Sequence, residues 1–155
     1  MHLAYLNLGS NIQPETNLPK AVELLREFGE IVKISQVWES EPVGKTGNNY
    51  LNVCVKFKTS MPLSDMKEKI IHPIENQLGR QRGADKFAPR SMDIDMILFD
   101  DESINDDTWE LAFVVVPLAN VYPTYCKTKS GESVLEIATR LRRAVWLEMR
   151  RGVLD

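Results

Sequence analysis

The sequence predicts an α+β protein in which one antiparallel sheet carries helices mainly on one face. Two observations predict this class. Residues 50–58 (YLNVCVKFK) alternate apolar side chains with polar or small ones, as a strand with one buried face does. Residues 18–28 instead repeat apolar side chains at helical spacing. Segments of the two kinds follow one another along the chain, which favours a sheet packed against helices.

The first half of the chain reads as a strand, a helix and two strands. Residues 4–10 predict the first strand, and the helix that follows has Gly29 as its stop signal. Residues 31–40 and 50–58 predict the next two strands. Between these strands, residues 41–49 (EPVGKTGNN) are rich in turn-forming residues and predict a loop.

The second half begins with a helix over residues 64–78. We expect an irregularity near Pro73, because proline lacks a backbone donor and clashes with the preceding turn. Residues 91–99 predict a strand, residues 113–118 (FVVVPL) another, and residues 133–150 a final amphipathic helix. This order, β-α-β-β-α-β with additions, predicts a ferredoxin-like sheet.

The overall composition is that of an ordinary globular protein. A length of 155 residues predicts one domain over residues 1–155, and a net charge of −3 gives no general attraction to nucleic acid or anionic membrane. No apolar run reaches the ~18 residues that span a bilayer. The two cysteines lack metal-ligand spacing and fit a reducing compartment. We therefore expect a cytoplasmic protein, and a monomer, without a nucleic-acid or membrane partner.

The most unusual segment is KFAPRSMDIDMILFDD (86–101), which sets Asp93 and Asp95 into an apolar strand. Side chains at i and i+2 leave a strand on the same face, so these two carboxylates lie side by side. Because such carboxylates repel each other and are costly to desolvate, the pattern predicts a cation beside them. With no histidine or cysteine nearby, Mg²⁺ shared with phosphate oxygens is the metal that fits.

A group of charged side chains precedes the aspartates. Arginine forks suit phosphate oxygens and neutralise the charge that develops during phosphoryl-type transfer. The alternative is that Arg80 and Arg90 simply form structural ion pairs with Asp93, Asp95 and Glu75. Spacing alone leaves both interpretations open. The charged side chains in question are Glu75, Arg80, Arg82, Lys86 and Arg90.

A second cluster suggests a site for a flat ring. Tyr50 and Asn52 share one face of their strand, where they can stack on a heterocycle and hydrogen-bond its amide-like edge. Phe87 and Phe113 are candidates for the opposite wall. Taken separately, aromatic residues of this kind are more often part of a core than of a binding site.

Together these segments resemble the 6-hydroxymethyl-7,8-dihydropterin pyrophosphokinase family of folate biosynthesis, over roughly residues 3–125. The resemblance implies transfer of pyrophosphate from ATP to the pterin hydroxymethyl oxygen, with release of AMP. It also implies two Mg²⁺ ions as cofactors. The segments that carry it are LGSN (8–11), EPVG (41–44), YLN (50–52), LGR (78–80) and KFAPRSMDIDMILF (86–99).

The resemblance also implies roles for individual residues. Asp93 and Asp95 match the metal-binding pair, and Arg80 and Arg90 match arginines that act on the phosphates. Phe87 stands where the family often has a tryptophan. The matched nucleotide-site residues are Glu75, Arg82 and Lys86. The matched pterin-site residues are Pro42, Val43, Gly44, Tyr50, Asn52, Phe87 and Phe113.

One segment departs from the family pattern. The family usually has a Pro-His-Pro segment and an arginine before the stretch matched by residues 113–118. Here the segment 104–113 is several residues shorter, and residues 91–139 contain neither histidine nor arginine. We therefore predict weakened ATP binding, unless Lys127 or Lys129 compensates.

Two alternatives to the enzyme remain open. The first is a pterin-binding paralogue without a working ATP site, which the shortened segment favours. The second is a ferredoxin-like nucleic-acid-binding or regulatory module that uses the C-terminal arginines. The apolar stripe of the last predicted helix favours a packed helix with a solvated basic face over nucleic-acid binding.

Overall fold

A computed structural model of the chain describes residues 1–44, 46–81, 83, 88–126 and 131–155. Its centre is one seven-stranded sheet in the order β6-β5-β1-β4-β3-β7, in which β2 also pairs with β4. The pairings are antiparallel. No helix of the described residues is long and apolar enough to cross a membrane. The strands are β1 (His2–Ser10), β2 (Glu30–Ile34), β3 (Val37–Ser40), β4 (Tyr50–Thr59), β5 (Asp93–Phe99), β6 (Glu102–Ser103) and β7 (Leu147–Arg150).

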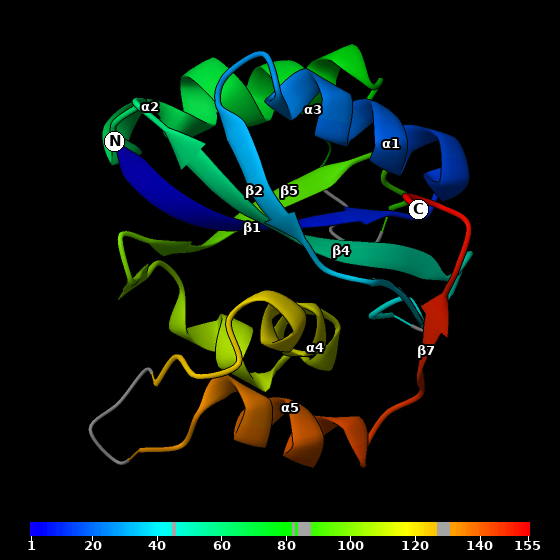
Figure 1. Cartoon of the computed structure of the whole chain (residues 1–155). Coiled ribbons are helices and arrows are strands. Elements are labelled where there is room, and N and C mark those ends of the chain that lie inside the picture. Colours follow the sequence, from blue (N-terminus) through cyan, green and yellow to red (C-terminus); the bar gives the residue numbers. More distant parts are fainter. Residues whose placement is uncertain (45, 82, 84–87, 127–130) are drawn as a thin grey trace.

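Helices cover both faces of this sheet (Figure 1). One face packs against α1 (Pro14–Leu25) and a second, composite helix, and the other packs against α4 (Ala112–Val121), which lies between the sheet and α5 (Val134–Arg142). The α+β, ferredoxin-like class is confirmed. The prediction that helices lie mainly on one face is wrong, because the segment after β5 forms helices rather than another strand. The composite helix consists of α2 (Leu63–Met66), the π-helical turn η1 (Lys67–Ile71) and α3 (His72–Gln77).

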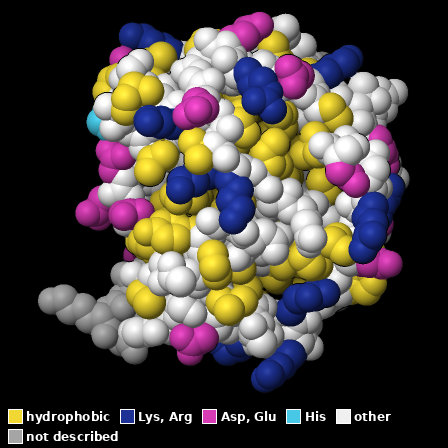
Figure 2. Space-filling model, in the orientation of Figure 1, with side chains coloured by type: hydrophobic (Ala, Val, Ile, Leu, Met, Phe, Trp, Pro, Cys, Tyr) yellow, Lys and Arg dark blue, Asp and Glu magenta, His cyan; other side chains and the backbone are white. Residues whose placement is uncertain are grey.

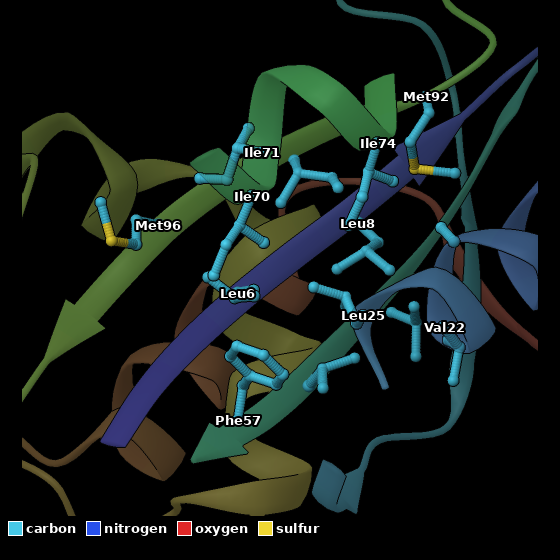
Figure 3. Close-up of a cluster of buried hydrophobic side chains, with 14 of the residues drawn as sticks. Leu6, Leu8, Val22, Leu25, Phe57, Ile70, Ile71, Ile74, Met92 and Met96 are labelled. Carbon is cyan, nitrogen blue, oxygen red and sulfur yellow. The ribbon is translucent and has the colours of Figure 1, made fainter. Parts of the chain in front are cut away.

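The face toward α1 and α3 is entirely apolar at its centre. Alternate residues of β1, β4 and β5 point into it, and Figure 3 shows Leu6, Leu8 and Phe57 meeting Leu25 and Ile74 there. Each of these five side chains is 0 or 1% exposed. Burial of this layer is the main favourable term in folding, at roughly 25 cal/mol per Å² of apolar surface.

Residues 113–118 form a helix, which corrects the prediction of a strand. The run of valines has high strand propensity, but a short apolar run does not distinguish a strand from a buried helix. In the structure α4 is apolar except for Asn120 and is sandwiched between the sheet and α5, so burial decides its conformation. Before it stands the short 3₁₀ helix η2 (Asp106–Glu110).

The predicted helix over residues 133–150 is also corrected. It begins as expected, because Ser133 and Glu136 form a capping box, but α5 ends at Arg142. The chain then turns and forms β7, which pairs with β3 from Val37↔Arg150 to Ser40↔Leu147. Pairing with the free edge of β3 thus makes residues 147–150 a strand, although their apolar spacing predicted a helix.

Two smaller differences concern irregular backbone. The predicted strand 31–40 is split into β2 and β3 at Ser35, whose hydroxyl accepts a hydrogen bond from the Cys54 amide at 2.7 Å. The irregularity expected near Pro73 takes the form of the π-helical turn directly before α3.

Candidate active site

A cavity of about 310 Å³ opens on the α4 side of the sheet, where the ends of β1, β4 and β5 meet residues 41–44 and the start of α4. Four segments far apart in sequence thus contribute to one site. The lining residues are Asn7, Gly9, Ser40, Glu41, Pro42, Val43, Gly44, Tyr50, Asn52, Arg90, Asp93, Asp95, Leu111 and Phe113.

Strand alternation explains why polar side chains gather here. Ile94 and Met96 point into the apolar layer, so Asp93 and Asp95 point to the opposite face and into the cavity. The same alternation on β4 turns Asn52 toward the cavity, where its Nδ2 donates to the Ser40 hydroxyl at 2.8 Å. Tyr50 lines the same cavity, so the two side chains share one strand face as their spacing predicts. Their role in binding a ring stays a prediction.

Asp93 is held by two arginines. Its Oδ1 accepts a hydrogen bond from Arg80 Nη1 and its Oδ2 accepts one from Arg90 Nη1, both at 2.9 Å. Arg80 Nη1 also donates to Oε2 of the buried Glu75 at 2.6 Å, and that oxygen accepts the Ile94 amide at 2.8 Å. The ion pairs expected as the structural alternative are therefore present for Asp93 and Glu75.

Asp95 is different, because within the described part of the chain its carboxylate has no hydrogen bond or ion pair. Desolvation in the cavity, followed by the negative charges of Asp93 and Glu75, raises the pKa of Asp95 to about 6. The Asp95 side chain remains open to the cavity. Solvent therefore screens these charges, and the raised pKa corresponds to only a small change in the free energy of unfolding.

The carboxylate pair fits Mg²⁺. Among the described residues no group of three or more acidic, histidine or cysteine side chains could hold a metal alone. Two carboxylates that open into a cavity, one of them without a partner, are what Mg²⁺ uses when phosphate oxygens and water complete its shell. Arg90 lines the same cavity and can bind those phosphates.

Residues 41–44 form one wall, and hydrogen bonds hold residues 48 and 49 further along the chain. Asn49 Nδ2 donates to Glu39 Oε2 at 2.8 Å, and Arg150 of β7 donates to Glu39 Oε1 at 2.7 Å. These two hydrogen bonds lower the pKa of Glu39. Asn11 Nδ2 donates to the Asn48 carbonyl at 3.3 Å, while Asn11 Oδ1 accepts the Arg90 amide at 2.7 Å, so this side chain joins two walls of the cavity.

The structure brings together most of the residues predicted from the sequence. Arg80 and Glu75 do not line the cavity and instead lie behind Asp93. The cavity-lining residues that were predicted are Pro42, Val43, Gly44, Tyr50, Asn52, Arg90, Asp93, Asp95 and Phe113. The predicted residues outside the described part of the chain are Arg82, Lys86, Phe87, Lys127 and Lys129.

Sequence reasoning missed several lining residues, of which Asn7 is the most informative. It is a polar residue inside an apolar strand, the same signal that marked Asp93 and Asp95, and it was available in AYLNLGS (4–10). Ser40, Glu41 and Leu111 carry no such signal. Gly9 matters through the space it leaves, since a Cβ there would lie 3.2 Å from Asn52 Oδ1.

The C-terminal arginines are divided between two elements instead of forming one helical face. Arg142 of α5 lies over the Trp38 ring at 4.7 Å, Arg140 pairs with Glu132, and Arg150 pairs with Glu39. On the face that Figure 2 shows, the described basic and acidic side chains are interspersed. This arrangement gives no support to the nucleic-acid alternative.

Sequence comparison identifies one family. The family model for "7,8-dihydro-6-hydroxymethylpterin-pyrophosphokinase (HPPK)" matches residues 5–123. The chain is 37% identical over 133 residues to the 2-amino-4-hydroxy-6-hydroxymethyldihydropteridine pyrophosphokinase of Aquifex aeolicus, covering 79% of this chain and 82% of that protein. It is 35% identical over 127 residues to the enzyme of the same name from Helicobacter pylori, covering 74% and 77%.

Structural comparison agrees at the level of the fold. The HPPK-DHPS triple mutant of Plasmodium falciparum, solved with SDX-DHP, superposes with a TM-score of 0.68 at 15% identity. A second HPPK-DHPS structure, solved with substrates, gives a TM-score of 0.69 at 13% identity. These matches cover 90% and 92% of this chain but only 44% and 43% of those longer chains.

Proposed function

The chain belongs to the 7,8-dihydro-6-hydroxymethylpterin-pyrophosphokinase family, whose reaction transfers pyrophosphate from ATP to hydroxymethyldihydropterin in folate synthesis, and we propose that it carries out this reaction in the cavity on the α4 side of its sheet. One observation carries this placement. Tyr50, Asn52 and Phe113, here called the slot, line the same cavity as Asp93, Asp95 and Arg90.

The slot orients the pterin. Asn52 offers an amide to the ring edge, while Tyr50 and Phe113 offer aromatic surface to the ring faces. Backbone groups of Pro42 to Gly44 line the same cavity and can hydrogen-bond the ring edge. Held in this way, the hydroxymethyl oxygen faces the carboxylates, and positioning of this kind supplies much of the rate enhancement in phosphoryl transfer.

Asp93 and Asp95 are the residues that would hold Mg²⁺, and we propose two ions. The metal supplies charge neutralisation on the triphosphate. Arg90 lines the cavity and binds the transferring group, and Arg80 holds Asp93 in place from behind while Glu75 orients Arg80. Such preorganised charge stabilises the negative charge of the transition state.

The short segment before α4 predicts a weakness in ATP binding. Residues 91–126 contain no Lys, Arg or His, so η2 and α4 bring no cation to the nucleotide. A lost charge-assisted contact costs about 1.5–3 kcal/mol, which predicts ATP affinity roughly ten- to a hundredfold below that of a relative with the full-length segment. We expect a raised Michaelis constant for ATP.

The test is a direct assay of the full chain with ATP, Mg²⁺ and 6-hydroxymethyl-7,8-dihydropterin, followed by chromatography of the nucleotides. AMP formation that requires both Mg²⁺ and the pterin supports the proposal. Calorimetry with a non-hydrolysable ATP analogue measures the nucleotide affinity separately. Pterin binding without AMP formation at saturating ATP would favour the non-catalytic paralogue.

A further inference from the structure

Asn7 stands in the middle of β1 with its side chain in the floor of the cavity and only 3% of its surface exposed. Its Oδ1 is buried without a hydrogen-bond partner, and among the described residues its amide makes no hydrogen bond at all. Buried amides are hydrogen-bonded in the great majority of native proteins. An exception in the wall of a binding cavity indicates that the partner is a ligand.

Other buried asparagines of the chain show what a structural role looks like. Asn17 Nδ2 donates to the Ile12 carbonyl at 2.6 Å. Asn11 Nδ2 donates to the Asn48 carbonyl, and its Oδ1 accepts the Arg90 amide. Asn7 has no equivalent contact, although it is as deeply buried as these two. A role in holding the fold therefore does not account for it.

The strand register places Asn7 between the two halves of the site. Asn7 is paired with Asp95 on β5, and Gly9, the next residue on the same face, is paired with Asn52 on β4 and Asp93 on β5. Because Gly9 has no side chain, the floor is open between the amide of Asn52 and the carboxylates. A ring lying there passes over Gly9 and beside Asn7.

We propose that Asn7 is a further substrate-binding residue, whose amide hydrogen-bonds a polar atom on the edge of the bound pterin ring. A primary amide offers both a donor and an acceptor, and a pterin edge presents both kinds of partner. The ligand thus satisfies an amide that the folded chain leaves unsatisfied. This inference rests on the proposed pterin site and adds a recognition residue to it.

The test measures binding and stability in the same variants of the full chain. Calorimetry with 6-hydroxymethylpterin should give an affinity roughly three- to tenfold lower for Asn7→Ala than for the unmodified chain, the value of one neutral hydrogen bond. The melting temperature without ligand should be unchanged or higher, because no hydrogen bond of the protein is lost. In the matched control, Asn17→Ala, the melting temperature should fall while the pterin affinity stays the same.

Several outcomes would overturn the assignment. Unchanged pterin affinity in Asn7→Ala is one, and a loss of folding or of melting temperature as large as that of Asn17→Ala is another. A weaker affinity for the Mg²⁺ complex of an ATP analogue, with pterin affinity intact, would make Asn7 a nucleotide or metal contact instead. If the unmodified chain itself bound no pterin, the proposed function would fail, whereas equal binding by both chains removes only the role of Asn7.

Discussion

The two faces of the sheet carry different side chains although the same three central strands supply both. Toward α1 and α3, strands β1, β4 and β5 present an unbroken apolar layer (Figure 3). Toward α4, the same strands are apolar at one end and polar at the other, where the cavity lies. The comparison indicates a division of labour, in which one face mainly supplies stability and the polar end of the other supplies recognition and chemistry.

The largest expected effect tests this division with one substitution made on each face. Phe57 is 0% exposed in the apolar layer, so Phe57→Ala should lower the free energy of unfolding by about 3–5 kcal/mol. Phe113 lines the cavity and is only partly buried, so Phe113→Ala should cost less stability and more pterin affinity. Denaturant titration and calorimetry measure the two quantities. Equal losses of pterin affinity in both variants would contradict the division.

Removal of a cavity carboxylate should lower activity strongly without lowering stability. Asp95→Ala should slow AMP release on the order of 10³-fold, because charge neutralisation by a bound metal is worth several kcal/mol. Stability without metal should stay the same or rise, since the change removes one member of a repelling pair. Asp65→Ala, which breaks an exposed pair with Lys69, is the matched control and should change neither quantity appreciably. A large loss of metal-free stability in Asp95→Ala would instead identify Asp95 as a structural ion-pair member.

Substitution of Arg90 tests whether catalysis and ring recognition belong to different residues within the polar end of the α4 face. Arg90→Ala should slow turnover by roughly 10²–10³, because the arginine meets the charge that develops in the transition state. Pterin affinity should change little, since recognition of the ring belongs to the slot. Steady-state kinetics and pterin calorimetry separate the two effects. The assignment would not survive equal losses of turnover and pterin affinity.

The smallest expected effect is a pH dependence of stability, which arises from Asp95 at the polar end. Because the pKa of Asp95 is raised to about 6 in the folded chain, the folded state binds a proton that the unfolded state does not bind between about pH 4 and pH 6. The Asp95 contribution to metal-free stability should therefore increase as the pH falls through this window. Since the side chain is open to solvent, we expect less than about 1 kcal/mol.

The difference between the unmodified chain and Asp95→Asn isolates this contribution from that of other carboxylates. Glu39 has a lowered pKa, so its contribution to stability is lost as the pH falls, and it acts in the opposite direction in both chains. Thermal melts at several pH values in the presence of a chelator give the difference. A stability difference that does not vary between pH 4 and pH 6 would show that the Asp95 pKa is not raised.

Local patterns in the sequence were sufficient for the elements of the apolar face. Period-two alternation in β4 and helical spacing in α1 each mark one apolar face that packs in the apolar layer, so the pattern carries the structure directly. They were also sufficient to place Asp93 and Asp95 on one face of their strand, and Tyr50 and Asn52 on one face of theirs. Each of these inferences needs only the geometry of one strand.

On the α4 face, the conformation of the segments and the contacts of the polar side chains were decided only by the tertiary structure. The valine run of α4 is helical because it is enclosed between the sheet and α5, and β7 is a strand because β3 offers a free edge; neither cause is visible in a local window. The same holds for the site, where Asp93 is paired with two arginines and Asp95 with none of the described residues. Asn7 shows the limit most clearly, because its identity is plain in the chain but its unsatisfied amide exists only once β4, β5 and α4 enclose it. Long-range packing determines which polar groups are buried, and therefore which of them are left for a ligand.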